Sequence, residues 1–311
     1  MHFHTSKDKA DRGALLTEQN NANSKNIDKL TTSQIVGVFC NEDKIPQKAV
    51  YDAREQLTQA IDQISSKLDK DGRLFYIGCG TSGRLGVLDA AECPPTFCTP
   101  PELIQGIIAG GDSSLTKSSE GLEDKTDLSI YDLNQRNFSA KDVIIGISSG
   151  GTTPYVLSAL EYSKKLGALT ISITCVPKTQ VYIDTDIDIR LLTGPEIIAG
   201  STRLKAGTAT KMALNIISSG VMIKLGKVYG NRMIDLSISN RKLFDRSIRI
   251  LMDIINIDRE KASNLIKISN GSLKISILIH FTGMDSASAR KLLDQNNNNL
   301  TYSLEKLGIK K

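Results

Sequence analysis

The chain has few of the residues that usually bind metals or act as imidazole acids and bases. Its 311 residues include three histidines and five cysteines. Two of the histidines, His2 and His4, stand at the very start, and the cysteines do not form the paired spacings of metal-ligating motifs. We therefore expect no metal site, no histidine-based catalysis and reduced thiols. If the chain is an enzyme, carboxylates, lysine or tyrosine must transfer its protons.

Long apolar runs and concentrated charge are also missing. No apolar run approaches the ~20 residues that cross a membrane, and the polar N-terminus lacks the apolar centre of a signal peptide. The net charge of +5 is small, and the basic residues are scattered, with no aromatic-rich basic block. We expect a cytoplasmic protein that binds neither membranes nor nucleic acid. A small anionic substrate fits the mild positive excess.

The most informative stretch that is present runs over residues 74–96. An apolar, strand-like run meets a loop of small residues, and a helical pattern follows at once. This order presents free backbone N–H groups and the positive end of a helix dipole to an anion. The loop lacks the Gly-Lys-Ser/Thr of a nucleotide-binding loop, and no acidic residue closes a second strand as in a dinucleotide site. We interpret Gly80, Thr81 and Ser82 as contacts to a sugar phosphate; a tight structural turn is the alternative.

A second loop repeats this order. It follows another apolar run, it is rich in hydroxyls, and a helix starts after it at Pro154, where a missing N–H costs nothing. Two such loops after two parallel strands form one side of a pocket. The contacts that we expect from this loop are Ser148, Ser149, Thr152 and Thr153.

Charged residues near these loops are candidates for the chemistry. Glu92, Glu123 and Glu196 each lie at a predicted helix end or in a loop, and Lys205 lies in a third Gly/Ser/Thr-rich segment that opens a long helix. Two carboxylates can divide general acid and general base work when their surroundings separate their pKa values. For each of these residues, the alternative is a solvated or structural charge.

The wider pattern predicts an α/β fold, a doubly wound and mostly parallel sheet flanked by helices. Residues 14–70 read mainly as helix. After residue 72 short apolar runs alternate with helical patterns, as in a parallel sheet covered on both faces. The expected strands are 74–77, 103–108, 143–147, 170–174 and 187–191. The expected helices between them are 83–91, stopped by Pro94-Pro95, then 113–122, 154–166 and 208–225.

The last part of the chain reads as a small all-helical module. Two segments that begin at Asp258 and Asp285, 27 residues apart, match in register. Each reads as a helix, a polar turn and a second helix start. The module is either a structural or dimer-supporting appendage or a protein-binding module. We divide the chain into an N-terminal tail with helices at 1–50, a sugar-phosphate-binding domain at 51–245 and the helical module, with its repeat, at 246–311.

Several long motifs resemble one family, the N-acetylmuramic acid 6-phosphate etherases, which carry a sugar-isomerase (SIS) domain. The resemblance covers roughly residues 14–300. It rests on LLTEQNN (15–21), YIGCGTSGRLGVLDAAECPPTF (76–97), IAGGD (108–112), GLEDKTD (121–127), GISSGGTTPYV (146–156), GPEIIAGSTRLKAGTATKMALN (194–215) and GKVYGNRMIDL (226–236).

This resemblance implies a cytoplasmic homodimer that acts in the recycling of cell-wall sugars without a cofactor. The implied reaction is a carbon–oxygen lyase reaction on N-acetylmuramic acid 6-phosphate. The sugar ring opens, the proton on C2 is removed, D-lactate leaves from C3, and water adds to give N-acetylglucosamine 6-phosphate. The motif AECPPT makes Glu92 the proton donor, and GLED makes Glu123 the C2 base. We also expect Glu196 and Lys205 to contact the substrate or its phosphate, because both lie near the predicted pocket.

The chain departs from the family pattern at a few positions. Thr152 stands where arginine is common, and Cys79 replaces the usual alanine; neither departure alters the two glutamates. Two other readings remain open at this point. One is an aldose–ketose isomerase on the same fold, which also needs a carboxylate base. The other is a non-catalytic sugar-phosphate sensor, as in the glucokinase regulatory proteins.

Overall fold

A five-stranded parallel sheet forms the centre of the first of two compact units in this computed structural model. The structure describes residues 12–118, 120–236, 238 and 240–309. The first unit lies within residues 1–91 and 102–218, and the second within residues 92–101 and 219–311. The strands are β1 (Leu74–Gly78), β2 (Ile104–Ile108), β3 (Val143–Ile147), β4 (Leu169–Thr174) and β5 (Ile187–Arg190).

The sheet order is β2-β1-β3-β4-β5. Strand β2 is added on one side of β1 and β3 to β5 on the other, so the strand order reverses between β1 and β3. Every residue of β1, β3 and β4 is buried. This explains why those strands appear in the sequence as continuous apolar runs: helices cover both faces. The expected α/β class and the doubly wound parallel sheet are confirmed.

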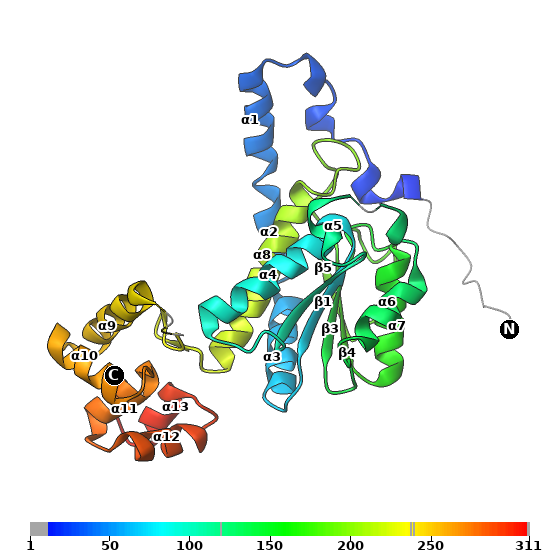
Figure 1. The fold of residues 1–311 in the computed structure, drawn as a ribbon. Coiled ribbons are helices and arrows are strands. Elements are labelled where there is room, and N and C mark those ends of the chain that lie inside the picture. Colours follow the sequence, from blue (N-terminus) through cyan, green and yellow to red (C-terminus); the bar gives the residue numbers. More distant parts are fainter. Residues whose placement is uncertain (1–11, 119, 237, 239, 310–311) are drawn as a thin grey trace. The chain divides into compact units, whose positions relative to one another are not determined.

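Helices flank the sheet on both faces (Figure 1). On one face α7 packs on β3 and β4, and α6 packs against α7. On the other face lie α3, α4 and α8, and α4 comes so close to β1 that a side chain at Gly86 would overlap Tyr76. The helices of this unit are α1 (Thr32–Glu42), α2 (Ile45–Asp52), α3 (Arg54–Leu68), α4 (Gly80–Phe97), α5 (Ser113–Thr116), α6 (Thr126–Asn134), α7 (Pro154–Leu166) and α8 (Lys205–Lys224), of which α4 and α8 extend into the second unit.

Some of the expected helix boundaries are wrong. Helix α4 does not stop at the prolines but continues to Phe97, with Pro94 and Pro95 in its last turns. Proline lacks an N–H but keeps its carbonyl, and the Pro94 carbonyl accepts the backbone N–H of Cys98 at 2.9 Å. The expected helix at 113–122 is broken into the single turn α5 and a 3₁₀ turn, η5 (Glu120–Leu122). A distant residue accounts for the break near α5: the guanidinium of Arg84 takes three carbonyls that a longer helix would use.

Short 3₁₀ turns precede α1 and form the start of the described chain. They are η1 (Arg12–Ala14), η2 (Leu16–Glu18), η3 (Ala22–Ser24) and η4 (Ile27–Lys29). The segment is held against the loop between β4 and β5: the amide of Gln180 donates to the Ala14 carbonyl at 3.0 Å, and its oxygen accepts from the Leu16 N–H at 3.0 Å. Leu15 is buried, although this part of the sequence is mostly polar.

The second unit is mainly helical. It contains a two-stranded hairpin, β6 (Val228–Tyr229) and β7 (Arg232–Met233), followed by α9 (Arg241–Ile255), α10 (Arg259–Ile268), α11 (Leu273–Thr282), α12 (Ser286–Asp294) and α13 (Leu300–Lys306). The apolar run at 275–281 is part of α11, whose residues 273–278 are buried. None of the helices that the structure describes is long and apolar enough to cross a membrane.

The two copies of the 27-residue repeat adopt the same local structure. Asp258 and Asp285 each accept a hydrogen bond from the backbone N–H three residues on and so begin α10 and α12. Asn270 and Asn297 adopt left-handed backbone conformations, with φ of 51° and 52°. Each copy is therefore a capped helix, a left-handed polar turn and the start of a second helix.

Candidate sugar-phosphate site

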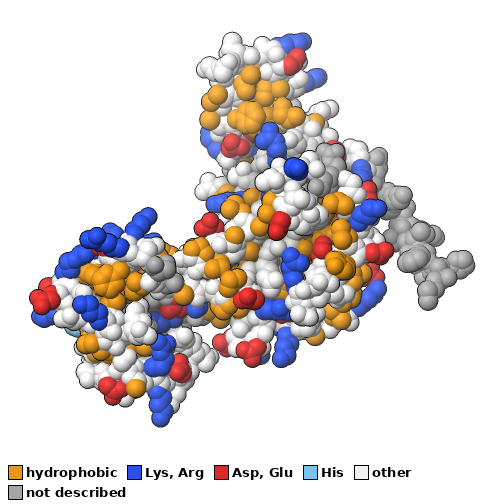
Figure 2. Space-filling view, viewed as in Figure 1, with side chains coloured by type: hydrophobic (Ala, Val, Ile, Leu, Met, Phe, Trp, Pro, Cys, Tyr) orange, Lys and Arg blue, Asp and Glu red, His pale blue; other side chains and the backbone are white. Residues whose placement is uncertain are grey.

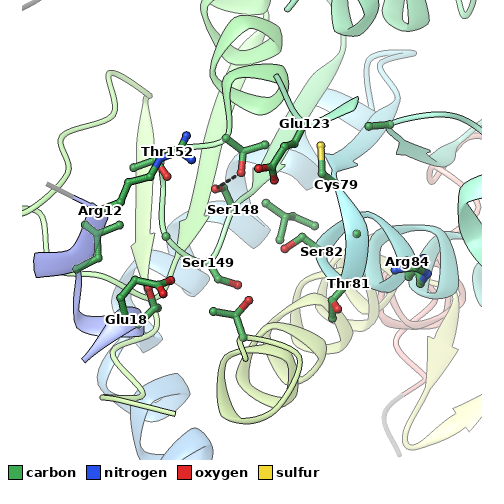
Figure 3. Close-up of a pocket in the computed structure, with 18 of the residues that line it drawn as sticks. Arg12, Glu18, Cys79, Thr81, Ser82, Arg84, Glu123, Ser148, Ser149 and Thr152 are labelled. Atoms are coloured by element: carbon green, nitrogen blue, oxygen red, sulfur yellow. Dashed lines mark hydrogen bonds between the residues drawn. The ribbon is translucent and has the colours of Figure 1, made fainter. Parts of the chain in front are cut away.

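A cavity of about 530 Å³ opens at the carboxyl ends of β1 and β3. This is the point where the strand order reverses, which is where open α/β sheets bind ligands. The two loops after these strands and the N-terminal segment line the cavity (Figure 3). All seven expected phosphate contacts in those two loops line it: Gly80, Thr81, Ser82, Ser148, Ser149, Thr152 and Thr153.

Glycines shape the first loop. Gly80 has φ of +52°, in the left-handed region that side chains disfavour. A side chain at Gly78 would lie 2.7 Å from the backbone nitrogen of Gly83, so the chain can turn this tightly only without one. Helix α4 begins at Gly80, and the hydroxyls of Thr81 and Ser82 lie beside its first N–H groups. The loop therefore offers an anion both backbone and side-chain donors.

The second loop presents another helix start. Gly151 adopts φ of +70°, and its N–H donates to the Ser148 carbonyl at 3.0 Å. The Ser148 and Thr153 hydroxyls are 2.9 Å apart and hydrogen-bonded, which orders both side chains. Thr153 is the residue before α7, and Pro154 is its first residue. The positive ends of two helices thus meet in one cavity.

Glu123 is the carboxylate between these loops. It is half-buried, and its carbonyl accepts the N–H of Tyr155 at 2.9 Å, which ties the glutamate to the start of α7. In Figure 3 its carboxylate points toward the hydroxyl of Ser148, with Cys79 beside it. Burial raises the pKa of the Cys79 thiol to about 12, and the negative charges of Glu123 and Asp124 contribute. This thiol therefore stays protonated next to the carboxylate.

The N-terminal segment supplies cavity residues that the sequence analysis did not identify. Arg12, Thr17 and Glu18 all line the cavity. A polar segment far from the strands gives no local indication that it lies over their ends. The motif LLTEQNN (15–21) contains Thr17 and Glu18, but it supports only the family resemblance and does not by itself assign a site residue.

Two expected contacts, Glu196 and Lys205, are not among the residues that line the cavity. Both are buried. The Glu196 carboxylate accepts the backbone N–H groups of Lys205 and Ala206 at 2.9 Å each, so it caps α8 three residues before the start that we expected from the sequence. Burial raises the pKa of Glu196. The Lys205 ammonium donates to Glu42 at 2.6 Å.

The Glu42 carboxylate collects further bonds from the N-terminal segment. The side-chain amides of Asn21 and Asn23 donate to it at 2.6 and 2.8 Å. The hydroxyl of Ser24 also donates to the Ile197 carbonyl at 2.7 Å. Glu196 and Lys205 thus belong to a buried network that holds the N-terminal segment against α8.

Glu92 is exposed on α4 and is not among the cavity-lining residues. Ten residues separate it from Ser82, about 15 Å of helix. No group of three His, Cys, Asp or Glu side chains in the described ranges is arranged to hold a metal ion.

The parallel sheet and its two hydroxylic loops define the first unit as an SIS domain. The SIS domain model matches residues 130–218, and the model of the N-terminal SIS domain of glucokinase regulatory protein matches residues 56–164. The model of the C-terminal lid domain of glucokinase regulatory protein matches residues 230–270, in the second unit.

Curated relatives identify the family. The chain is 58% identical over 309 residues to the N-acetylmuramic acid 6-phosphate etherase of a strain of Prochlorococcus marinus, covering 99% of each chain. It is 56% identical over 295 residues to that of Crocosphaera subtropica, covering 95% of this chain and 97% of the relative. The chain belongs to the N-acetylmuramic acid 6-phosphate etherase family, whose members are carbon–oxygen lyases. The resemblance stated from the sequence is confirmed.

Among solved structures, the chain is similar to a phosphoheptose isomerase from Neisseria gonorrhoeae. The sequence identity is 18%, the TM-score is 0.44, and the match covers 61% of this chain and 97% of the isomerase.

Proposed function

We propose that this chain cleaves the D-lactyl ether of N-acetylmuramic acid 6-phosphate, giving N-acetylglucosamine 6-phosphate and D-lactate. One observation carries the proposal within a chain of this family. The N-termini of α4 and α7, with their serine and threonine hydroxyls, line the same cavity as the carboxylate of Glu123. This cavity lies where the strand order of the sheet reverses. This combination fits a phosphorylated substrate whose carbon skeleton loses a proton.

The phosphate binds at the starts of α4 and α7. Backbone N–H groups and the hydroxyls of Thr81, Ser82, Ser148 and Thr153 supply donors that do not depend on pH. Two helix dipoles add positive potential at the same place. None of the described residues that line the cavity is a lysine, and the loops supply donors directly at the two helix starts.

Glu123 acts as the base that removes the C2 proton. In the open-chain sugar the aldehyde at C1 acidifies this proton, so a carboxylate suffices and neither a metal nor an organic cofactor is needed. Only two carboxylates line the described cavity, Glu123 and Glu18. Glu123 is the one whose backbone is tied to the start of α7, beside the phosphate loops.

Glu92 acts as the acid that protonates departing lactate, the role that the family resemblance implies. Since it lies outside this cavity, we propose that it reaches the substrate bound by a second copy of the chain in a cytoplasmic homodimer. Exposed apolar side chains on three helices support such a dimer: Val36 on α1, Leu88 on α4 and Ile216 on α8. Figure 2 shows apolar side chains gathered on the surface over α1. The reaction would recycle cell-wall sugars.

Turnover in deuterated water separates the two roles. The wild type should release lactate, and its sugar product should carry deuterium at C2. Glu92→Gln should still exchange the C2 proton but release lactate at least 100-fold more slowly, since general acid catalysis contributes about 10²–10⁴-fold. Glu123→Gln should lose both. Exchange at C2 at the wild-type rate in Glu123→Gln would exclude Glu123 as the base.

Mixed dimers test whether Glu92 acts across the interface. When Glu92→Gln and Glu123→Gln chains are combined, one cavity of each mixed dimer has an intact Glu123 and receives an intact Glu92 from the other chain. Activity should then return to a fraction of the wild-type rate. Mixed dimers that stay as inactive as either parent would show that both glutamates act within one chain. A monomer by light scattering would exclude the dimer itself.

A further inference from the structure

The proposed substrate carries two anionic groups, a phosphate and the carboxylate of its lactyl ether. The two helix starts account for the phosphate, but neither accounts for the carboxylate. The described cavity lining contains two cations, Arg12 and Arg84, and two anions, Glu18 and Glu123. Which of the two arginines is available to the carboxylate decides how the substrate is recognised.

Arg84 is committed to the protein. Its guanidinium donates to the carbonyls of Ser114 at 2.7 Å, Leu115 at 2.9 Å and Lys117 at 3.0 Å. These bonds end α5 and hold the chain after β2. A guanidinium with its donors occupied in this way contributes charge but has few N–H groups left for a ligand.

Arg12 is the available cation. Its side chain is exposed to the cavity mouth and extends along the wall toward Thr152 (Figure 3). No residue in the described part of the chain accepts a hydrogen bond from its guanidinium. Its backbone is held in place, because the next residues are clamped by Gln180 and Leu15 is buried.

The rest of this wall also suits a polar ligand. The hydroxyl of Thr17 is buried and lacks a hydrogen-bond partner among the described residues, although it belongs to a cavity-lining residue. Glu18 lies on the same wall and would repel a carboxylate unless a cation offsets it. A guanidinium meets that need, since it binds a carboxylate through two parallel N–H bonds.

We propose that Arg12 binds the lactyl carboxylate and thereby makes the cavity specific for the ether-bearing sugar over hexosamine phosphates that lack it. The inference rests on the proposed function, because it assumes that substrate. It predicts that Arg12 contributes to the binding of N-acetylmuramic acid 6-phosphate but not to that of N-acetylglucosamine 6-phosphate, which has the phosphate and no carboxylate.

Binding of these two sugar phosphates to the full chain tests the inference. Calorimetry in a Glu123→Gln background avoids turnover. Adding Arg12→Gln should weaken binding of N-acetylmuramic acid 6-phosphate by about 10- to 100-fold, as expected for a hydrogen-bonded charge pair. Binding of N-acetylglucosamine 6-phosphate should change less than threefold. Arg12→Lys should retain part of the preference, since it keeps the charge without the paired geometry.

Lys25→Gln is the matched control, since it removes the same charge from an exposed position of the same segment outside the cavity lining. It should change neither affinity. Equal weakening of both ligands by Arg12→Gln, or no weakening of either, would overturn the inference. Lactate release by the wild type tests the proposed function separately, so failure of that function is distinguishable from failure of the Arg12 assignment.

Discussion

Replacing Lys205 by methionine should destabilise the first unit by about 3–5 kcal/mol, although the substitution keeps the length of the side chain. Lys205 and Glu42 form an ion pair at 2.6 Å, with side chains only 1% and 5% exposed. Removing the lysine leaves a buried carboxylate with the two amide donors of Asn21 and Asn23. The lost charge-assisted bond and the unpaired buried charge both disfavour the folded state.

An exposed pair provides the comparison. Lys48 and Asp52 also lie 2.6 Å apart, but their side chains are 75% and 54% exposed. Water screens such a pair, so Lys48→Met should change stability by less than about 0.5 kcal/mol. The contrast separates the effect of burial from that of distance. Denaturant-dependent hydrogen exchange of the amides in β1 and β3 would report the opening of the first unit alone.

The double variant isolates the interaction energy between Lys205 and Glu42. Glu42→Gln with Lys205→Met removes both charges, so it should be less destabilising than the sum of the single changes, by about 2 kcal/mol. An additive double variant, or a Lys205→Met protein as stable as Lys48→Met, would refute the reasoning.

The pH dependence of this effect has a definite sign. Burial alone would raise the pKa of Glu42, but hydrogen bonds from Lys205, Asn23 and Asn21 outweigh it, and the pKa is lowered below its usual 4.5. The network therefore stabilises the folded state fully above pH 4.5 and loses this contribution as the pH falls through the lowered value. Between pH 7 and 3, the wild type should lose more stability than Glu42→Gln.

Three further outcomes follow from single positions. Gly106→Ala should destabilise the protein by about 1–3 kcal/mol in urea unfolding, since its new methyl group would lie 2.5 Å from the Cα of Val87; an unchanged midpoint would contradict this close contact. The Cys79 thiol, with its pKa near 12, should react with iodoacetamide at pH 8 roughly a thousandfold more slowly than a free cysteine; mass spectrometry would reveal fast labelling if this is wrong. Alanine at Asn270 or Asn297 should cost about 1 kcal/mol because of the left-handed backbone, and glycine should not; a calorimetric midpoint that treats alanine and glycine alike would argue against it.

Strand positions were predictable because their cause is local. Residues of β1, β3 and β4 are buried on both sides, so each strand is apolar along its whole length. Helix ends were less predictable, because distant side chains determine them. Arg84 ends α5, and the carboxylate of Glu196 starts α8.

The candidate site divides in the same way. The two phosphate loops were recognisable because glycines and hydroxyls at the end of a strand define a local structure. Arg12 and Glu18 were not recognisable, because nothing local indicates that a polar N-terminal segment lies over the sheet. Glu196 and Lys205 have side chains of a type that could contact a sugar phosphate, but both are buried outside the cavity lining.

The sequence by itself determined the α/β class, the two loops at the switch point and membership of the etherase family, since short-range pattern and long motifs carry that information. Only the tertiary structure decided which charges face the cavity and which are buried together. Lys205 and Arg12 are both cations in polar segments, and their sequences do not distinguish them. Packing buries Lys205 against Glu42 and leaves Arg12 at the cavity, because burial and partner choice depend on contacts between residues far apart in the chain.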